Sequence, residues 1–178
     1  FSQRLCGTCD HELYATAQRN GLHRTIHAGE GLGPPSVWDA IQLLGVERVG
    51  HGVRAIEDSS LVAYMAEHCI PIEVCPTSNI RTGLYKSYAD HPLKALFEAG
   101  VPITLNTDDP TFFATTLADE YDHAREMGLQ DSAILDIVKN GFRHAFLPEH
   151  ERSRYLTDVE STWASLVLKD RPEDYQAR

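Results

Sequence analysis

The sequence lacks the features that define several large classes of protein. No apolar run approaches the roughly 20 residues that a membrane-spanning helix needs, and no charged segment followed by an apolar one suggests a signal peptide. No dense block of Lys and Arg interrupts a chain of formal net charge −10, which argues against a nucleic-acid partner. No G-x-G-x-x-G motif follows an apolar stretch, so a dinucleotide-binding fold has little support. A composition of 42% hydrophobic and 24% charged residues favours one soluble globular domain.

Cysteine is scarce, with four residues in 178. Cys6 and Cys9 form a single C-x-x-C, and no second pair at suitable spacing completes a structural zinc site. We interpret both as ordinary reduced thiols. Cys69 and Cys75 flank a predicted strand and are expected to be small buried hydrophobes. This use of cysteine predicts a reducing, cytoplasmic compartment.

Helical patterns and short apolar runs alternate along the chain. Strands are predicted at 24–28, 48–50, 71–75 and 101–105. Helices are predicted over 10–20, 35–44, 59–68, 91–98, 115–127, 132–144 and 149–168. Such alternation indicates a parallel sheet, either a barrel or a doubly wound sheet. Polar clusters follow the strands, where barrel enzymes carry their active sites, and this favours the barrel.

A complete eight-stranded barrel needs about 250 residues, and about 200 is near the lower limit. This chain has 178 residues and four predicted strands. We therefore predict an α/β fold that is the C-terminal half of a (β/α)8 TIM barrel, with four parallel strands, surrounding helices and extra C-terminal helices. On this interpretation residues 1–178 form a single partial domain whose N-terminal half is absent.

Four polar clusters follow the four predicted strands. They are H-A-G-E at 27–30, G-H-G at 50–52, C-P-T-S-N at 75–79 and N-T-D-D-P at 106–110. A histidine at a strand end can bind a metal or act as a base, and two adjacent carboxylates can face a metal and a substrate separately. Each cluster alone also suits a buried histidine or a turn. The coincidence of four clusters favours a shared site.

These four motifs, in this order and spacing, closely resemble the motif series of the adenosine deaminase family. That family comprises metal-dependent barrel enzymes of the amidohydrolase superfamily, and the resemblance runs from about Gly21 to Glu149. It implies zinc-dependent hydrolytic deamination of a 6-aminopurine. Adenosine or 2′-deoxyadenosine would give inosine or 2′-deoxyinosine with release of ammonia. Adenine and larger 6-aminopurines remain alternative substrates.

The resemblance also implies roles for individual residues. His27 and Asp108 would be the metal ligands, holding one zinc ion in each complete active site. His51 would orient the attacking water or act as its base, and Asp108 would accept a hydrogen bond from that water. Zinc suits this reaction because it lowers the pKa of a bound water to about 7. The catalytic residues would thus include His51 and Asp108.

Substrate binding is implied for three residues. Glu30 would hold the purine and donate a proton to ring nitrogen N1, which makes it catalytic as well. Asp109 would hydrogen-bond to N7. Gly29 would let the backbone approach the ligand closely. Ser78 and Asn79 would be supporting residues.

One departure from the family pattern limits what this chain can do alone. Family members take two further zinc ligands from a His-x-His on the first barrel strand, and this sequence contains no His-x-His. Two protein ligands are too few for a tight zinc site, and half a barrel leaves two open sheet edges. We expect the chain to be inactive by itself, as a fragment, a processed product or part of a split protein. The N-terminal half would be needed in cis or in trans.

Two other functions compete with purine deamination. One is a different amidohydrolase that acts on a cyclic amide or ester, against which the assignments of Glu30 and Asp109 argue. The other is a metal-free binding or scaffolding protein that kept the fold. The expected ligand is a small purine nucleoside or base, with no nucleic acid and no membrane as partner.

Overall fold

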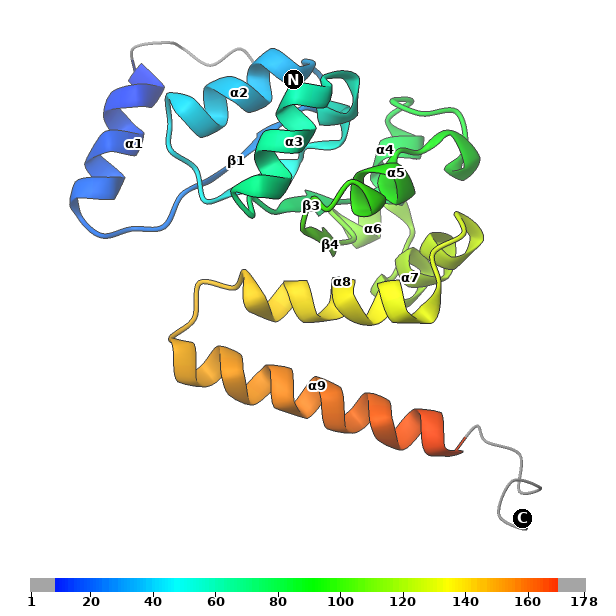
Figure 1. Ribbon diagram of the computed structural model, residues 1–178. Coiled ribbons are helices and arrows are strands. Elements are labelled where there is room, and N and C mark those ends of the chain that lie inside the picture. Colours follow the sequence, from blue (N-terminus) through cyan, green and yellow to red (C-terminus); the bar gives the residue numbers. More distant parts are fainter. Residues whose placement is uncertain (1–8, 170–178) are drawn as a thin grey trace.

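Four short parallel strands run through the centre of the protein (Figure 1), in a computed structural model that describes residues 9–169. They are β1 (Thr25–Ala28), β2 (Arg48–His51), β3 (Ile72–Val74) and β4 (Ile103–Leu105). They pair in chain order, β1-β2-β3-β4, and every pairing is parallel. The predicted set of four parallel strands is confirmed.

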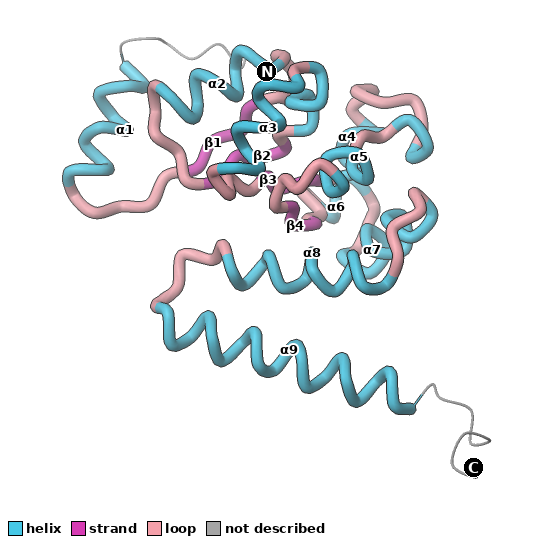
Figure 2. Tube along the Cα trace, viewed as in Figure 1, coloured by secondary structure: helices cyan, strands magenta, loops and turns pink. Residues whose placement is uncertain are grey.

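Helices join successive strands and surround the sheet. The α-helices are α1 (Cys9–Arg19), α2 (Pro34–Gln42), α3 (Ser59–Glu67), α4 (Pro76–Arg81), α5 (Leu93–Glu98), α6 (Pro110–Phe113), α7 (Leu117–Glu126), α8 (Asp131–Arg143) and α9 (Glu149–Lys169). Two 3₁₀ turns, η1 (Val53–Glu57) and η2 (Tyr88–Asp90), complete the described elements. Figure 2 shows the strands in the interior with helices around them. A helix in each crossover is what parallel pairing requires.

The hydrophobic core fills the space between the sheet and the connecting helices. The strands contribute Val49, Ile72 and Ile103, which are fully buried. Helices α3 and α5 contribute Leu61 and Leu96 to the same cluster. Parallel strands need such coverage, which explains why their sequences are short apolar runs.

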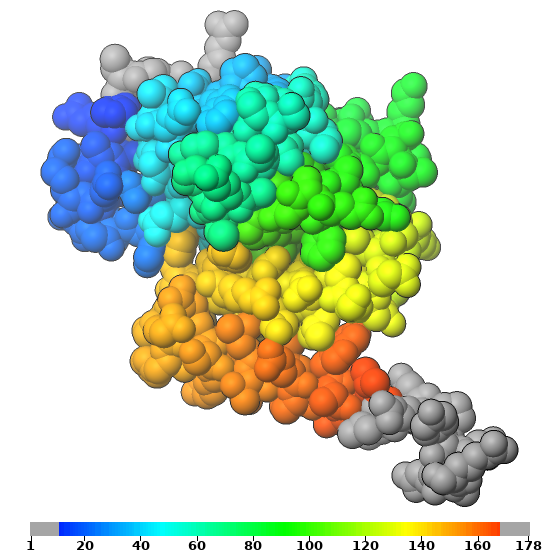
Figure 3. Space-filling view, viewed as in Figure 1, coloured from blue at the N-terminus to red at the C-terminus, as the bar shows by residue number. Residues whose placement is uncertain are grey.

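The two C-terminal helices form a layer at one side of the molecule. Helix α8 packs on β4, and α9 packs on α8 (Figure 1). Figure 3 shows α9 extended along this side. Within residues 9–169, none of the helices combines the length and the apolar character needed to cross a bilayer.

The sheet ends at β1 on one side and at β4 on the other, among the residues that the structure describes. Side chains on β1 show the consequence, because Thr25 and His27 are exposed although both belong to a strand of the sheet. A closed barrel would have a further strand beside each of these edges. The arrangement agrees with the predicted half barrel.

The structure bears on two sequence interpretations, that of the polar segment after β3 and that of the cysteines. Residues 76–81 suggest turn and cap chemistry but form α4, for which Pro76 at the first helical position was the available signal. Cys69 was expected to be buried, and this is wrong: it is exposed, in a left-handed turn with φ of 51°. Cys75 is buried as predicted. Cys6 lies outside the described residues, so the C-x-x-C interpretation stays a prediction.

A buried carboxylate ties α7 to the start of α4. Glu120 is 0% exposed, and it accepts hydrogen bonds from the Thr77 backbone N–H at 3.1 Å and from the Thr115 hydroxyl at 2.6 Å. Replacing Glu120 with Gln puts an amide where two donors converge. We expect the free energy of unfolding to fall by about 1–3 kcal/mol, measured by urea denaturation. Glu126→Gln, an exposed change on the same helix, is the control, and equal losses in both variants would contradict this role.

Candidate active site

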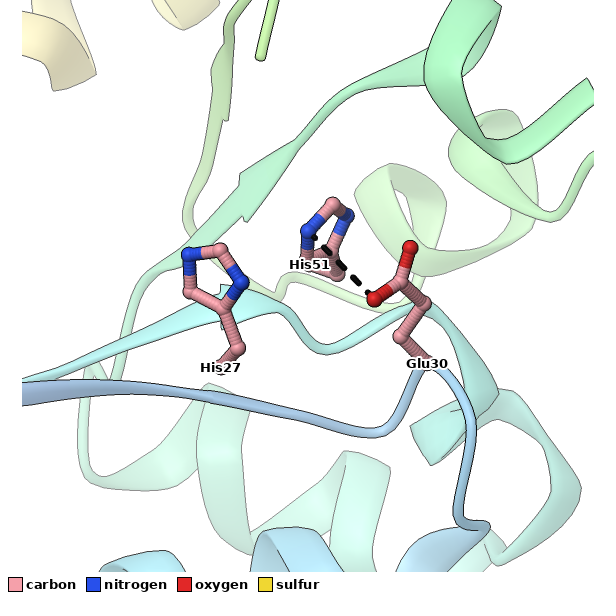
Figure 4. A group of neighbouring side chains, drawn as sticks. All are labelled: His27, Glu30 and His51. Atoms are coloured by element: carbon pink, nitrogen blue, oxygen red, sulfur yellow. Dashed lines mark ion pairs between the residues drawn. The ribbon is translucent and has the colours of Figure 1, made fainter. Parts of the chain in front are cut away.

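Four predicted site residues converge at the carboxyl ends of the strands. His27 lies on β1, His51 ends β2, and Glu30 and Asp108 follow β1 and β4 closely. His51 Nε2 is 3.7 Å from Glu30 Oε2 and 3.9 Å from Asp108 Oδ2. Figure 4 shows Glu30 close to the imidazoles of His27 and His51. The centroids of the two rings are 4.8 Å apart, and their planes meet at 82°. The sequence prediction that these clusters share one rim agrees with this geometry.

Two groups of possible metal-binding side chains overlap at His51. One consists of His27, Glu30 and His51, and the other of His51, Cys75 and Asp108. Within each group the candidate ligand atoms lie within 4.8 Å of one another. The sequence interpretation missed Cys75 as a neighbour of this site. Its position directly after β3, next to the polar cluster, was the available signal.

The backbone is strained at the two residues that anchor the site. His51 and Asp108 have φ values of 58° and 57°, in the left-handed region that non-glycine residues rarely occupy. Such conformations cost on the order of 1–3 kcal/mol and tend to cluster at functional sites. Gly50 leaves room for the His27 ring, because a Cβ at Gly50 would lie 2.6 Å from His27 Cδ2. Local conformation is thus adapted to the positions of these side chains.

Side chains of helix α4 form hydrogen bonds with two of the converging residues. Ser78 donates a hydrogen bond from Oγ to Asp108 Oδ2 at 2.7 Å. Asn79 Nδ2 lies 3.3 Å from His51 Nδ1. Both side chains are buried. Ser78 and Asn79, which the sequence predicts to be supporting residues, therefore contact Asp108 and His51 respectively.

Asp109 and Gly29 have structural contacts of their own. Asp109 caps α6, accepting a hydrogen bond from the Phe112 N–H at 2.9 Å. Gly29 donates from its N–H to Ser36 Oγ and accepts from the Arg54 N–H, both at 2.9 Å, and its φ is 67°. These contacts shape the turns that carry Glu30 and the α6 start. Direct contact of Asp109 and Gly29 with substrate stays a prediction.

Two cavities open at the converging side chains. One, of about 410 Å³, is lined by His27, His51 and Asp108 among others. The second, of about 900 Å³, shares those three residues and adds Glu30, Asp109, Leu84, Phe112 and Phe113. Volumes of this order suit a small ligand. The lining combines polar groups with the apolar side chains of Leu84, Phe112 and Phe113, a mixture that suits a ligand with a flat aromatic body.

Burial controls the charge of His51. Burial lowers the pKa of His51, and the carboxylates of Glu30 and Asp108 oppose this while His27 adds to it. The imidazole is therefore neutral near pH 7. Cys75 is also neutral, because burial raises the pKa of its thiol. Its Sγ donates to the carbonyl of Glu73 at 3.5 Å.

The donor set suits zinc in kind. Imidazole nitrogen and carboxylate oxygen are ordinary zinc ligands, and His27 and Asp108 line the same cavity. Catalytic zinc sites use three protein ligands and keep one position open. These two residues therefore fit as part of a coordination set rather than the whole of it.

Comparison with known proteins agrees with the arrangement of the site. The family model described as "Adenosine deaminase" matches residues 6–162. An adenosine deaminase of Klebsiella pneumoniae is 45% identical over 154 residues, covering 86% of this chain and 46% of the relative. The aminodeoxyfutalosine deaminase of Streptomyces coelicolor is 43% identical over 146 residues, covering 82% of this chain and 38% of the relative. The chain thus spans less than half the length of these curated relatives.

A solved structure shares the fold. An amidohydrolase of Burkholderia ambifaria with bound zinc superimposes with a TM-score of 0.83 at 27% identity, covering 89% of this chain and 45% of that structure. The four parallel strands and their helices correspond to about half of a deaminase barrel. The sequence match, the shared fold and the converging side chains lead to one conclusion. The chain belongs to the adenosine deaminase family.

Proposed function

We propose that this chain carries the C-terminal half of the active site of a zinc-dependent purine deaminase. The reaction would convert adenosine or 2′-deoxyadenosine to inosine or 2′-deoxyinosine, consuming water and releasing ammonia. The observation that carries the proposal is the convergence of Glu30, His51 and Asp108 from three separate strand ends. Membership of the adenosine deaminase family supports it.

His27 and Asp108 are the residues that would hold the cation. Both residues line one cavity, as ligands of a shared cation must. A divalent cation bound there would supply a water acidic enough to attack at neutral pH. Ser78 would fix the orientation of Asp108 through its 2.7 Å hydrogen bond, as outer-shell partners of metal ligands do.

The residues around the cation would orient the attacking water and transfer a proton to the purine. Attack of water at C6 breaks the aromaticity of the purine ring and places negative charge on N1. Glu30, on the turn after β1, would protonate N1 and so remove that charge. His51 and Asp108 would orient the attacking water by hydrogen bonds. Asp109 would hold N7 through the oxygen that does not cap α6.

The proposed site needs residues from a second structural half. The chain offers two assigned zinc ligands, whereas three protein ligands are usual for catalysis. It also covers only 46% of the Klebsiella relative. We propose that the missing strands and ligands come from an N-terminal half, in cis or in trans. The 178-residue chain alone would then be inactive.

Larger 6-aminopurines form a second class of candidate substrate. The Streptomyces relative is named for aminodeoxyfutalosine rather than adenosine. The larger cavity, beside Leu84, Phe112 and Phe113, is where additional substrate atoms could be accommodated. Adenine, which lacks a sugar, is the opposite alternative.

A substrate panel on the complete enzyme tests the proposal. Adenosine, 2′-deoxyadenosine, adenine and a 5′-extended adenine nucleoside would each be followed by the absorbance change from a 6-aminopurine to a hypoxanthine chromophore. Zinc content would be measured on the same sample. We expect deamination with about one zinc per site. Hydrolysis of cyclic amides alone would favour another amidohydrolase, and a metal-free, inactive protein would favour a scaffold.

A further inference from the structure

A buried chain of hydrogen bonds reaches His51 through the ring nitrogen that does not face the carboxylates. It begins at the backbone N–H of Leu93, which donates to His91 Nδ1 at 3.1 Å. His91 Nε2 lies 3.1 Å from Asn79 Oδ1, and Asn79 Nδ2 lies 3.3 Å from His51 Nδ1. The three side chains are buried, with 6%, 0% and 2% of their surface exposed for His91, Asn79 and His51.

The direction of each hydrogen bond in this chain follows from the first one, which the Leu93 N–H donates. A backbone N–H can only donate, so His91 Nδ1 must accept from Leu93. Burial lowers the pKa of His91 to about 4, so the ring is neutral and carries its single proton on Nε2. That proton is donated to Asn79 Oδ1. The amide orientation of Asn79 is thereby fixed, and its Nδ2 group donates to His51 Nδ1.

We propose that His91 and Asn79 are positioning residues: the Asn79 amide donates to His51 Nδ1 and so leaves the ring proton of His51 on Nε2. In this tautomer Nδ1 accepts from Asn79, and Nε2–H points toward Glu30 and Asp108. The catalytic consequence rests on the proposed function, whereas the tautomer itself does not.

The tautomer decides between the two roles open to His51. An imidazole that presents N–H to the cavity can donate a hydrogen bond to the attacking oxygen and stabilise negative charge there. It has no lone pair on that side with which to remove a proton. His51 therefore acts as a donor in the resting enzyme, and removal of the water proton falls to Asp108, whose Oδ2 lies 3.9 Å from His51 Nε2.

Asn79→Asp is the variant that reverses the direction of the hydrogen bond between residue 79 and His51 with little change in side-chain shape. A carboxylate at position 79 can accept from both rings, so His51 would carry its proton on Nδ1 and present a bare Nε2 to the cavity. In Ser-His-Asp enzymes, imposing the wrong tautomer on the histidine lowers kcat by about 10⁴-fold. We expect kcat to fall by about 10²–10⁴-fold, with a smaller change in KM.

The direct readout is the protonation of each ring nitrogen. Long-range ¹H–¹⁵N spectra of the complete, zinc-loaded enzyme with ¹⁵N-labelled histidine distinguish a protonated nitrogen from an unprotonated one, and the spectrum of His51→Gln assigns the His51 signals. We expect Nε2–H in the unmodified enzyme and Nδ1–H in Asn79→Asp. Asn140→Asp is the matched control, since Asn140 is also buried but donates to the Ile103 carbonyl. It should leave the His51 signals unchanged.

Two substitutions of His91 test separately the contacts that His91 makes with Leu93 and Asn79. His91→Gln keeps a donor for Asn79 Oδ1 and an acceptor for the Leu93 N–H, so it should preserve the His51 tautomer. His91→Leu removes both groups and should give signals of both tautomers.

The proposal is overturned by Nδ1–H on His51 in the unmodified enzyme, or by His51 signals that are the same in Asn79→Asp and in both His91 variants. If Asn79→Asp does not fold, the His91 pair decides. An enzyme that shows Nε2–H but deaminates no purine would refute the proposed function and leave the tautomer standing.

Discussion

Replacing Glu30 with Gln is expected to lower purine deamination by the complete enzyme by about 10²–10⁴-fold. Glutamine keeps the size of the side chain and can hydrogen-bond to N1, but it has no acidic proton to transfer. The zinc content should stay unchanged, because Glu30 is not an assigned ligand and His27 and Asp108 are intact. Steady-state kinetics and metal analysis on one sample measure both quantities.

Glu67→Gln provides the matched control for Glu30→Gln. Glu67 is an exposed residue at the end of α3, and its substitution makes the same change of charge away from the site. We expect full activity from it. A Glu30→Gln enzyme that retains zinc and deaminates at the normal rate would remove Glu30 from the proposed role.

Removing His27 is expected to abolish zinc binding and with it the activity. Loss of an outer-shell partner of a metal ligand costs about 10–100-fold in metal affinity, so loss of a ligand should cost more than about 100-fold. Ser78→Ala, which removes the hydrogen bond to Asp108, should fall in the smaller range. Zinc affinities measured by competition with a chelator should therefore weaken modestly in Ser78→Ala and severely in His27→Ala.

An exposed histidine gives the control for His27→Ala. His11, on α1, lies outside both groups of possible metal-binding side chains. Its replacement by Ala should leave zinc affinity unchanged. Retention of zinc by His27→Ala, or equal losses in the His11 and His27 variants, would contradict the assignment of His27 as a ligand.

The strands and the site rim were predictable because their signals are local. Each strand is a short apolar run followed directly by a polar cluster, and parallel pairing brings the carboxyl ends together. His27, Glu30, His51 and Asp108 therefore meet where the order of the clusters predicts. The motif resemblance added the assignment of individual roles, which no contact in the structure tests.

The contacts behind the rim were not predictable from the sequence. His91 stands beside Pro92, which suggests only the start of a helix, and its link to His51 passes through Asn79 on helix α4. Glu120 joins α7 to α4 across 43 positions of the chain. Local patterns carry no information about such long-range pairs. The exposure of Cys69 was missed for a different, local reason: the residue lies in a left-handed turn after α3, with φ of 51°, which its residue type does not indicate.

The position of the metal is the most direct test of the whole account. Anomalous X-ray scattering at the zinc edge, on crystals of the complete enzyme, locates zinc independently of any activity. We predict one zinc ion bound by His27, by Asp108 and by ligands from the N-terminal half, with Glu30 and His51 beside it. A zinc ion bound by His51 and Cys75 instead, or crystals of a fully active enzyme with no metal at this rim, would contradict it.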